Sequence, residues 1–309
     1  MKSNLTFSEK LRKKWLNGDI PMWIMLAPTI FFIVVISLYP FIWICRFVFY
    51  DYNGFKAYYI GMDNFKRVFT DGIYWSSVVH TFEYAFLKLL FVLPLSLITA
   101  VLLQRKRMGS GLFQGIYFLP TVISSAVYSL IWYFIFATYN GVMNGYLQAA
   151  HIISQPIDWL GSSKTAMIAV VIVAIWGAFG NYMILLLSGL AGIPDDVYES
   201  AKIDGANGIQ TFFRITLPML GPVLKMVIML AVTTAFKDYQ SILVLTGGGP
   251  NNRTHVMFSY IYQLTFGTAS SQANLQIGYG SVLSIFSAVI VGIITLIYLH
   301  FSKKMDEVY

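Results

Sequence analysis

The stretch Glu199-Ser200-Ala201-Lys202-Ile203-Asp204-Gly205, followed nine residues later by Ile215-Thr216-Leu217-Pro218, is polar and helix-forming. It lies between two long apolar segments, 165–190 and 218–245. Each of these segments exceeds the roughly 20 apolar residues that a helix needs to cross a bilayer. A patterned polar insert between two such segments indicates that another protein binds it outside the bilayer.

The composition shows that the solvent of this chain is a lipid bilayer. Of its 309 residues, 57% are hydrophobic and 11% are charged, whereas about 25% of the residues of a soluble domain are charged. Backbone groups inside a bilayer must be satisfied within their own segment, so each apolar stretch is expected to be a helix. Six stretches qualify: 22–48, 77–103, 111–137, 165–190, 218–245 and 277–301. The sequence therefore predicts an all-α integral membrane protein with six transmembrane helices.

The distribution of lysine and arginine predicts the orientation of these helices. Cytoplasmic loops of membrane proteins carry an excess of both residues. Here the excess lies in the N-terminal arm, the loop after the second stretch, the insert and the tail: Lys2, Lys10, Arg12, Lys13, Lys14, Arg105, Lys106, Arg107, Lys202, Arg214, Lys303 and Lys304. The arm 1–21, the tail 302–309 and the insert are therefore expected in the cytoplasm. The net charge of +7 is explained by this topology without a nucleic-acid partner.

The insert, residues 193–218, reads as a helix, a turn and a second short helix. Pro194 with two following carboxylates is typical of a helix start, because acidic groups suit the positive end of the helix dipole. Asp204-Gly205 is typical of a helix end, since glycine accepts the left-handed cap. Asn207 with Gln210 three residues later resembles a capping box.

This pattern resembles the EAA loop of type I ABC importer permeases. That motif reads Glu-Ala-Ala, three residues, Gly, nine residues, Ile-x-Leu-Pro, and the chain matches it at Glu199, Ala201, Gly205, Ile215, Leu217 and Pro218. Ser200 stands where alanine is usual, and Asp204 and Ala206 match the Asp-Gly-Ala version common in carbohydrate permeases. The resemblance implies that the insert forms coupling helices, which sit in a cleft of a separate ATPase subunit.

A second stretch narrows the resemblance to the MalF/UgpA-like carbohydrate-uptake family. Leu245-Thr246-Gly247-Gly248-Gly249-Pro250, then Thr254 and Tyr260-Ile261-Tyr262, is similar to the external loop after the fifth span of these permeases. The resemblance covers about residues 20–300 and implies the MetI-like permease fold in a bacterial cell membrane. It also implies four kinds of partner, namely a second homologous permease, an ABC ATPase dimer, an external solute-binding protein and a sugar substrate.

Neither a nucleotide site nor a metal site is apparent in the sequence. Gly161-Ser162-Ser163-Lys164-Thr165 lacks the glycine directly before the lysine and the earlier glycine of a phosphate loop. The chain has one cysteine, Cys45, and its four histidines are scattered without ligand spacing. We therefore expect a non-catalytic subunit without a cofactor of its own, with ATP and magnesium bound on the partner ATPase.

Spans four and five are the expected walls of the substrate path, because the resemblance implies that they line the sugar cavity. The matching positions are Trp176, Phe179, Gly180, Asn181, Thr233, Phe236 and Lys237, with Asp238 and Tyr239 beside them. Aromatic faces with amide and hydroxyl groups suit a sugar, and a lysine in the cavity suits a carboxylate. We therefore hypothesise an oligosaccharide that is acidic or derived from plant cell walls. The alternative for Lys237-Asp238 is a pair of side chains that reach the outer membrane interface.

Span two also contains two ionisable residues, Glu83 and Lys88. They are five residues apart, and each is expected to face protein.

Two other classes of protein were considered. An intramembrane enzyme needs clustered catalytic groups at depth, and such a cluster is not visible in the sequence. A stand-alone secondary transporter or channel is expected to contain inverted repeats with broken helices. These are not apparent in the sequence either, and this class leaves the insert unexplained.

Overall fold

The computed structural model describes residues 15, 19–104, 109–267 and 275–306. In this part of the chain, four helices are long and apolar enough to cross a membrane, and two bent helix pairs bring the number of spans to as many as six. The predicted all-α membrane fold is thus confirmed. Most of the basic residues that predict the orientation, those of the N-terminal arm and of loop 105–108, lie outside the described residues.

The helices follow one another along the chain with few strands between them. The described elements are α2 (Asp19–Phe32), η1 (Ile33–Leu38), α3 (Tyr39–Cys45), η2 (Arg46–Phe49), β1 (Tyr50–Tyr52), β2 (Ala57–Tyr59), α4 (Asp63–Thr70), α5 (Gly72–Gln104), α6 (Ser110–Val122), α7 (Ser125–Ile135), α8 (Val142–Ala149), α9 (Ala166–Ala191), α10 (Asp195–Ile203), α11 (Gly208–Thr211), η3 (Phe212–Thr216), α12 (Leu217–Met219), α13 (Gly221–Lys237), α14 (Gln240–Leu245), α15 (Met257–Phe266) and α16 (Ile277–Asp306). The segments η1 and η3 are π-helical, and η2 is a 3₁₀ turn.

Helix α9 lies at the centre of the bundle. It packs along α5, α6 and α13, and half of its most apolar window is buried, compared with 22% for α5 and for α16. Small residues allow these close approaches, as is usual between helices in membranes. Polar side chains also join the helices, because the Ser96 hydroxyl donates to the carbonyl of Phe179 (3.0 Å) and Tyr182 and Thr234 share a hydrogen bond (2.7 Å). Spans two, four and five therefore form one packed unit.

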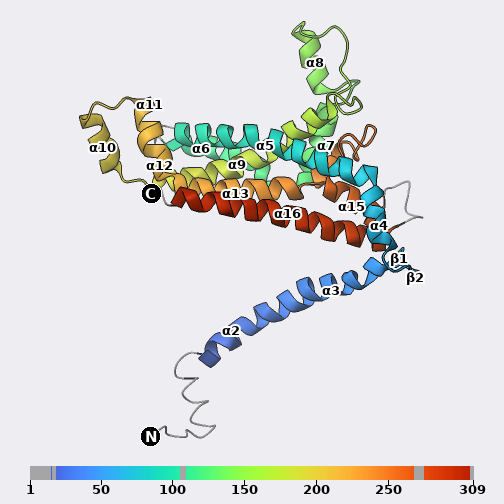
Figure 1. Cartoon of the computed structure of the whole chain (residues 1–309). Coiled ribbons are helices and arrows are strands. Elements are labelled where there is room, and N and C mark those ends of the chain that lie inside the picture. The colour runs from blue at the N-terminus through green and yellow to red at the C-terminus, as the bar shows by residue number, and fades with distance from the viewer. Residues whose placement is uncertain (1–14, 16–18, 105–108, 268–274, 307–309) are drawn as a thin grey trace, which may run out of the picture.

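The first span stands apart from the rest of the bundle. It runs from Pro21 to Phe49, and its most apolar window is not buried at all. Figure 1 shows α2 and α3 leaving the hairpin β1–β2 at an angle to the other helices. The apolar sides of this span are therefore left for lipid or for another membrane protein to cover.

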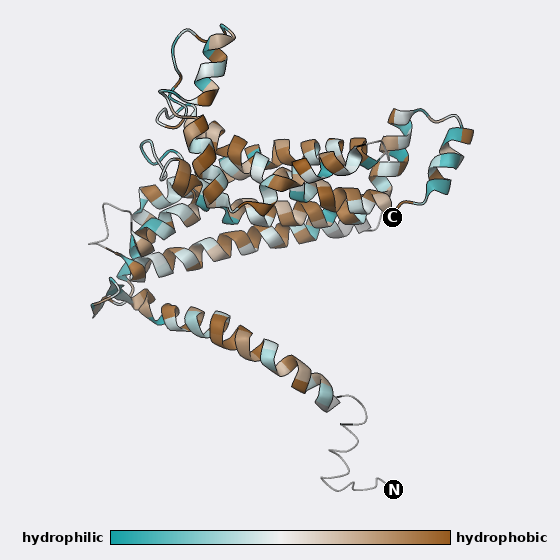
Figure 2. Cartoon of the chain, turned by 180° about the vertical axis from the view of Figure 1, so that it is seen from behind, coloured by the Kyte–Doolittle hydropathy of each residue, from teal (hydrophilic) through white to brown (hydrophobic). Residues whose placement is uncertain are grey.

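The two ends of the bundle carry different structures. Helices α10 and α11 lie at one end with the C-terminal part of α16, and the β1–β2 hairpin and α8 lie at the other (Figure 1). We call these the insert end and the hairpin end. Apolar residues dominate the helices between them, whereas α10 and the hairpin are more hydrophilic (Figure 2).

Spans three and five are broken, so the prediction of continuous helices over 111–137 and 218–245 is wrong. Helices α6 and α7 meet at 99°, and the helical segment 208–219 meets α13 at 72°. In span three, Ser124 has extended backbone and its side chain caps the amide of Val127, which begins a new helix. In span five, α13 stops at Lys237 because Asp238 is extended. Hydropathy averages over such breaks, since the residues on both sides are apolar.

A short antiparallel hairpin that the sequence did not predict lies after the first span. Tyr50 of β1 pairs with Tyr59 of β2. The side-chain amide of Asn64, on α4, donates to the carbonyls of Val48 and Tyr50 at 3.0 Å each. With three residues in each strand, the strands were too short to show alternation in the sequence. The hairpin and α4 therefore form a small ordered cap at this end of the bundle.

Candidate coupling and transport site

The insert has the predicted helix–turn–helix form. Helix α10 begins with Asp195 and Asp196 in its first turn, and Gly205 follows its end with φ of +77°. The amide of Ala206 donates to the carbonyl of Ala201 at 2.9 Å, which closes the cap. Asn207 and Gln210 form the predicted capping box, with each backbone amide 2.9 Å from the other side chain. The turn therefore depends on a left-handed backbone conformation at residue 205, which only glycine adopts easily.

The predicted coupling residues fall into an exposed group and a group turned to the bundle. Glu199, Ser200, Asp204 and Gly205 are exposed, Ala206 is half-buried, and Ala201 is buried. The three residues that close the motif, Ile215, Leu217 and Pro218, are half-buried where the insert returns to the bundle. The exposed residues lie on α10 and on the turn after it, which is the surface available to a partner.

Three apolar side chains of the insert were not among the predicted residues. Ile203 is 86% exposed, Ile209 is 72% exposed and Phe213 is 62% exposed. All three belong to the insert, where an exposed apolar side chain is a candidate for contact with a partner. In the sequence, the only signal for them is that they are large apolar residues within the polar insert.

Tyr198 connects the insert to the bundle. Its hydroxyl lies 3.4 Å from the side chains of Gln104, at the end of α5, and Thr216. Ile193, at the start of the insert, is buried in the same cluster as Leu190 and Leu220. Tyr198 and Ile193 therefore join the insert to the end of α5 and to the start of span five.

The two broken spans contact each other at their breaks. The first residue of α7, Ser125, hydrogen-bonds the side chain of Gln240, which is the first residue of α14, and α7 and α14 pack against each other. Each helix therefore begins next to the other, at a break in its span. Broken helices of this kind commonly lie near substrate sites of membrane transporters.

The predicted path residues separate into two groups. Asn181 and Lys237 are exposed, and Trp176, Thr233 and Tyr239 are half-buried. Two aromatic residues are instead buried between helices, because Phe179 packs edge-on against Tyr117 (5.5 Å between ring centroids) and Phe236 against Phe82 (5.1 Å). Asn181, Lys237 and their half-buried neighbours are thus the members of the predicted set that remain accessible to a ligand.

Asp238 is directed away from solvent and towards α5. Its carboxylate accepts hydrogen bonds from Lys88 Nζ at 3.0 Å and from the hydroxyl of Tyr84, and both partners are buried. Glu83 forms a separate ion pair with Arg253 at 3.0 Å. The expectation that Glu83 and Lys88 face protein is therefore confirmed, but the sequence did not indicate their partners, which lie more than 140 positions away.

The glycine-rich loop after α14 is held by a compact set of hydrogen bonds. Thr246 and Thr254 share one at 2.7 Å, and the Thr254 hydroxyl donates to the carbonyl of Gly249 at 2.7 Å. A Cβ on Gly248 would overlap the ring of His255. Burial, and then the nearby His80, lowers the pKa of His255 to about 4, so this imidazole is neutral at physiological pH. The loop is an ordered cap at the hairpin end.

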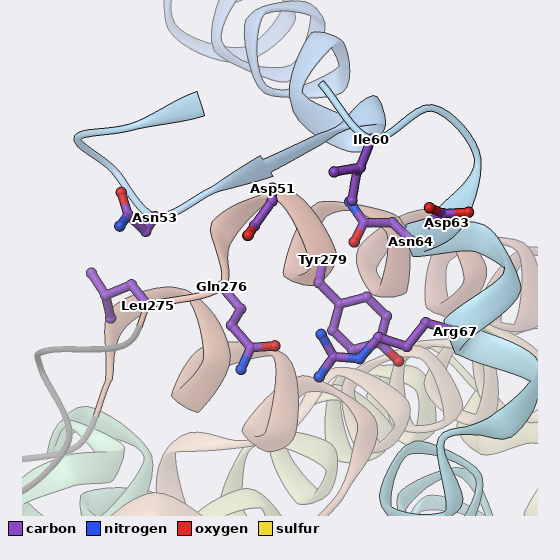
Figure 3. Close-up of a pocket in the computed structure, with 9 residues that line it drawn as sticks. All are labelled: Asp51, Asn53, Ile60, Asp63, Asn64, Arg67, Leu275, Gln276 and Tyr279. Atoms are coloured by element: carbon purple, nitrogen blue, oxygen red, sulfur yellow. The ribbon is translucent and has the colours of Figure 1, made fainter. Parts of the chain in front are cut away.

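A polar cavity of about 530 Å³ opens beside the hairpin. Figure 3 shows Arg67 in front of the ring of Tyr279, with Asp51 and Gln276 on other sides of the space. The Arg67 guanidinium lies 3.9 Å from the ring centroid of Tyr279, and in the described part of the chain it has no carboxylate within ion-pair distance. The buried side-chain oxygen of Gln276 also lacks a hydrogen-bond partner there. The cavity therefore presents the Arg67 cation, the carboxylates of Asp51 and Asp63 and one unsatisfied side-chain oxygen.

Residues 92–307 match the family described as the inner membrane component of binding-protein-dependent transport systems. The chain belongs to this family. It is a multi-pass membrane protein and a non-catalytic permease subunit of an ABC transporter, as the resemblance to type I ABC importer permeases predicted.

Two curated relatives align with almost the whole permease. The trehalose/maltose transport system permease MalF of Thermococcus litoralis is 31% identical over 307 residues, which cover 98% of this chain and 99% of the relative. The probable starch degradation products permease AmyD of Thermoanaerobacterium thermosulfurigenes is 28% identical over 296 residues, covering 96% and 98%.

A solved structure confirms the fold of the permease. A chain of a bacterial ABC transporter that imports the acidic polysaccharide alginate superimposes with a TM-score of 0.80 at 23% identity. The match covers 96% of this permease and 97% of that chain. The overall arrangement of helices in this permease is therefore shared with that chain.

Proposed function

We propose that this permease forms half of the translocation path of an ATP-driven importer of carbohydrates, with an oligosaccharide as substrate. The end-to-end match to the maltose and starch-product permeases carries the proposal. The accessible amide of Asn181 and the half-buried ring of Trp176 on α9 add support, because sugars are bound by aromatic faces and planar polar groups. Uptake by the reconstituted complex, measured against an oligosaccharide panel, tests it, and a complex that imports no sugar would contradict it.

Lys237 supports an acidic substrate. It ends α13, is exposed, and makes no ion pair in the described part of the chain. We expect Lys237→Ala to lower uptake of uronic-acid oligomers by about tenfold relative to neutral ones, since a charged hydrogen bond contributes roughly 1.5–3 kcal/mol. Competition uptake with both substrate classes measures the ratio, with Lys164→Ala, at another exposed lysine, as the control. An unchanged ratio would exclude Lys237 as the carboxylate contact.

Three protein partners are proposed. The ATPase dimer binds the insert, where Ile203, Ile209 and Phe213 are exposed beside the Glu199–Gly205 turn. A second permease covers the exposed first span and completes the path. An extracytoplasmic solute-binding protein docks at the hairpin end, opposite the insert (Figure 1). Co-purification of the assembled complex tests this set, and a functional importer that lacks an ATPase would contradict it.

The proposed orientation places both termini and the insert in the cytoplasm of a bacterial cell. It is supported by the basic residues of the arm, the loop 105–108, the insert and the tail. A cysteine placed at Ser200 in a Cys45→Ser background tests the orientation, because an impermeant thiol reagent should label it only from the cytoplasmic side.

Arg67 supplies a test of the docking of the binding protein. We expect Arg67→Glu to raise the half-saturating concentration of the binding protein by about tenfold, because arginine anchors in pockets often carry binding energy. Transport titrated with the binding protein gives this value. Lys56→Glu makes the same charge change on the hairpin outside the cavity and serves as the control. Equal effects of the two variants would indicate a general electrostatic effect rather than a contact at the cavity.

A further inference from the structure

The break between α13 and α14 is a defined conformation. Asp238 is extended, with φ of −69° and ψ of 134°, and Tyr239 has φ of −152° and ψ of −24°. Two residues, Asp238 and Tyr239, thus leave the helix between α13 and α14, next to the exposed Lys237. Irregular backbone at membrane depth is tolerated where it is buried in protein or lines a cavity. The break therefore needs contacts that hold it in place.

Two side chains on α5 and one on α14 supply those contacts. Lys88 is 4% exposed and Tyr84 is completely buried, and both lie on α5, one helical turn apart. They bind the same carboxylate oxygen of Asp238. Ser241, in the first turn of α14, lies 3.4 Å from the other carboxylate oxygen. A charge that is buried in a membrane protein is expensive unless it is paired, so this position is strongly specified.

The residues that follow the break are also bound to span three. Gln240 binds Ser125 at the start of α7, so α14 is joined both to span two and to the bend in span three. Helix α13, in contrast, leads from the break to the insert through α12. Lys237 and Tyr239, the two neighbours of Asp238, therefore lie between a helix connected to the insert and a half-helix anchored in the bundle.

We propose that Lys88, Tyr84 and Asp238 are positioning residues that fix the break in span five and thereby set the positions of Lys237 and Tyr239, the two neighbours of Asp238. The inference rests on the proposed function and adds residues that do not contact the substrate. Only 5% of the Lys88 side chain and 17% of the Asp238 side chain are exposed, which leaves little of either for a ligand. Their effect on transport is exerted through the residues on each side of Asp238.

The number of ATP molecules hydrolysed per substrate molecule imported distinguishes a positioning role of these residues from a purely structural one. A variant that only lowers the amount of folded complex reduces ATP hydrolysis and uptake together, and their ratio stays the same. A variant that misplaces the path residues still hydrolyses ATP but imports less. We expect Tyr84→Phe, which removes one hydroxyl and no charge, to raise this ratio by about fivefold or more, within the usual range of coupling between sites.

Tyr74→Phe is the matched control for this variant. Tyr74 is also completely buried on α5, and its hydroxyl also binds another span, at Ser287 (3.1 Å). Tyr74 lies ten residues from Tyr84 on α5. Loss of the Tyr74 hydroxyl should therefore leave the ratio of ATP hydrolysed to substrate imported at the wild-type value. Equal ratios for Tyr74→Phe and Tyr84→Phe would overturn the proposal.

The charged pair gives a second, independent set of variants. Asp238→Asn or Lys88→Met leaves one buried charge unpaired and should lower the yield of folded complex, whereas the double variant removes both charges and should restore the yield. We expect the restored complex to keep the raised ratio of ATP hydrolysed to substrate imported.

A double variant with the wild-type yield and the wild-type ratio would show that the pair of Lys88 and Asp238 is purely structural. If the double variant does not fold, Tyr84→Phe and its control decide. A wild-type complex without sugar uptake would refute the proposed function instead.

Discussion

Valine at Gly205 is expected to lower transport by about tenfold or more while the six spans remain folded. Gly205 has φ of +77°, a conformation that a β-branched residue adopts only with strain. A Cβ at this position meets no atom within 4 Å, so the substitution acts on the turn between α10 and α11 and not on packing. On the proposal that the insert binds the ATPase, the altered turn should move the exposed residues of α10 away from the position that this partner requires.

Uptake and ATP hydrolysis by the purified complex measure this loss of coupling, and size-exclusion chromatography with thermal unfolding reports on the spans. Gly208→Ala is the matched control, since Gly208 is in the same insert, lacks a positive φ and has open space at its Cβ. It should transport at the wild-type rate. Loss of the folded spans in Gly205→Val would instead mean that the insert is structural.

Alanine at Gly180 is expected to destabilise the bundle by about 3 kcal/mol, at the upper end of the usual cost of overpacking. A Cβ at Gly180 would overlap the carbonyl oxygen of Tyr117 and lie 2.9 Å from the Cα of Phe118. Both contacts are backbone atoms of α6, which cannot rotate away as a side chain does. Helix α9 is also held against α5 by the bond between Ser96 and Phe179, so it cannot shift to relieve the clash.

Thermal unfolding of the detergent-solubilised complex tests this expectation. The melting temperature of Gly180→Ala should fall by several degrees, or the yield of folded protein should fall. Gly115→Ala is the control, because Gly115 lies on α6 itself and a Cβ there meets no atom within 4 Å. If Gly180→Ala were as stable as the control, α6 and α9 would not be as closely packed as described.

The local features of the insert could be predicted because neighbouring residues determine them. The carboxylates of Asp195 and Asp196, the glycine at 205 and the pair Asn207 and Gln210 each act within one turn of a helix, and all took the predicted roles. The spans could also be located, because burial in lipid requires a long apolar stretch whatever the neighbouring helices are. The burial of Phe179 and Phe236 could not be predicted, since an aromatic residue in a span can face lipid, a path or another helix, and residues distant in the chain decide which.

The sequence by itself determined that this protein is a multi-pass membrane protein with a helical insert between its fourth and fifth apolar stretches, because hydropathy and caps depend on residues that are adjacent in the chain. The tertiary structure decided where spans three and five break and that Lys88 and Tyr84 bind Asp238. A buried charge requires a partner, but any of several distant residues can satisfy that requirement. The choice is made only when the helices pack.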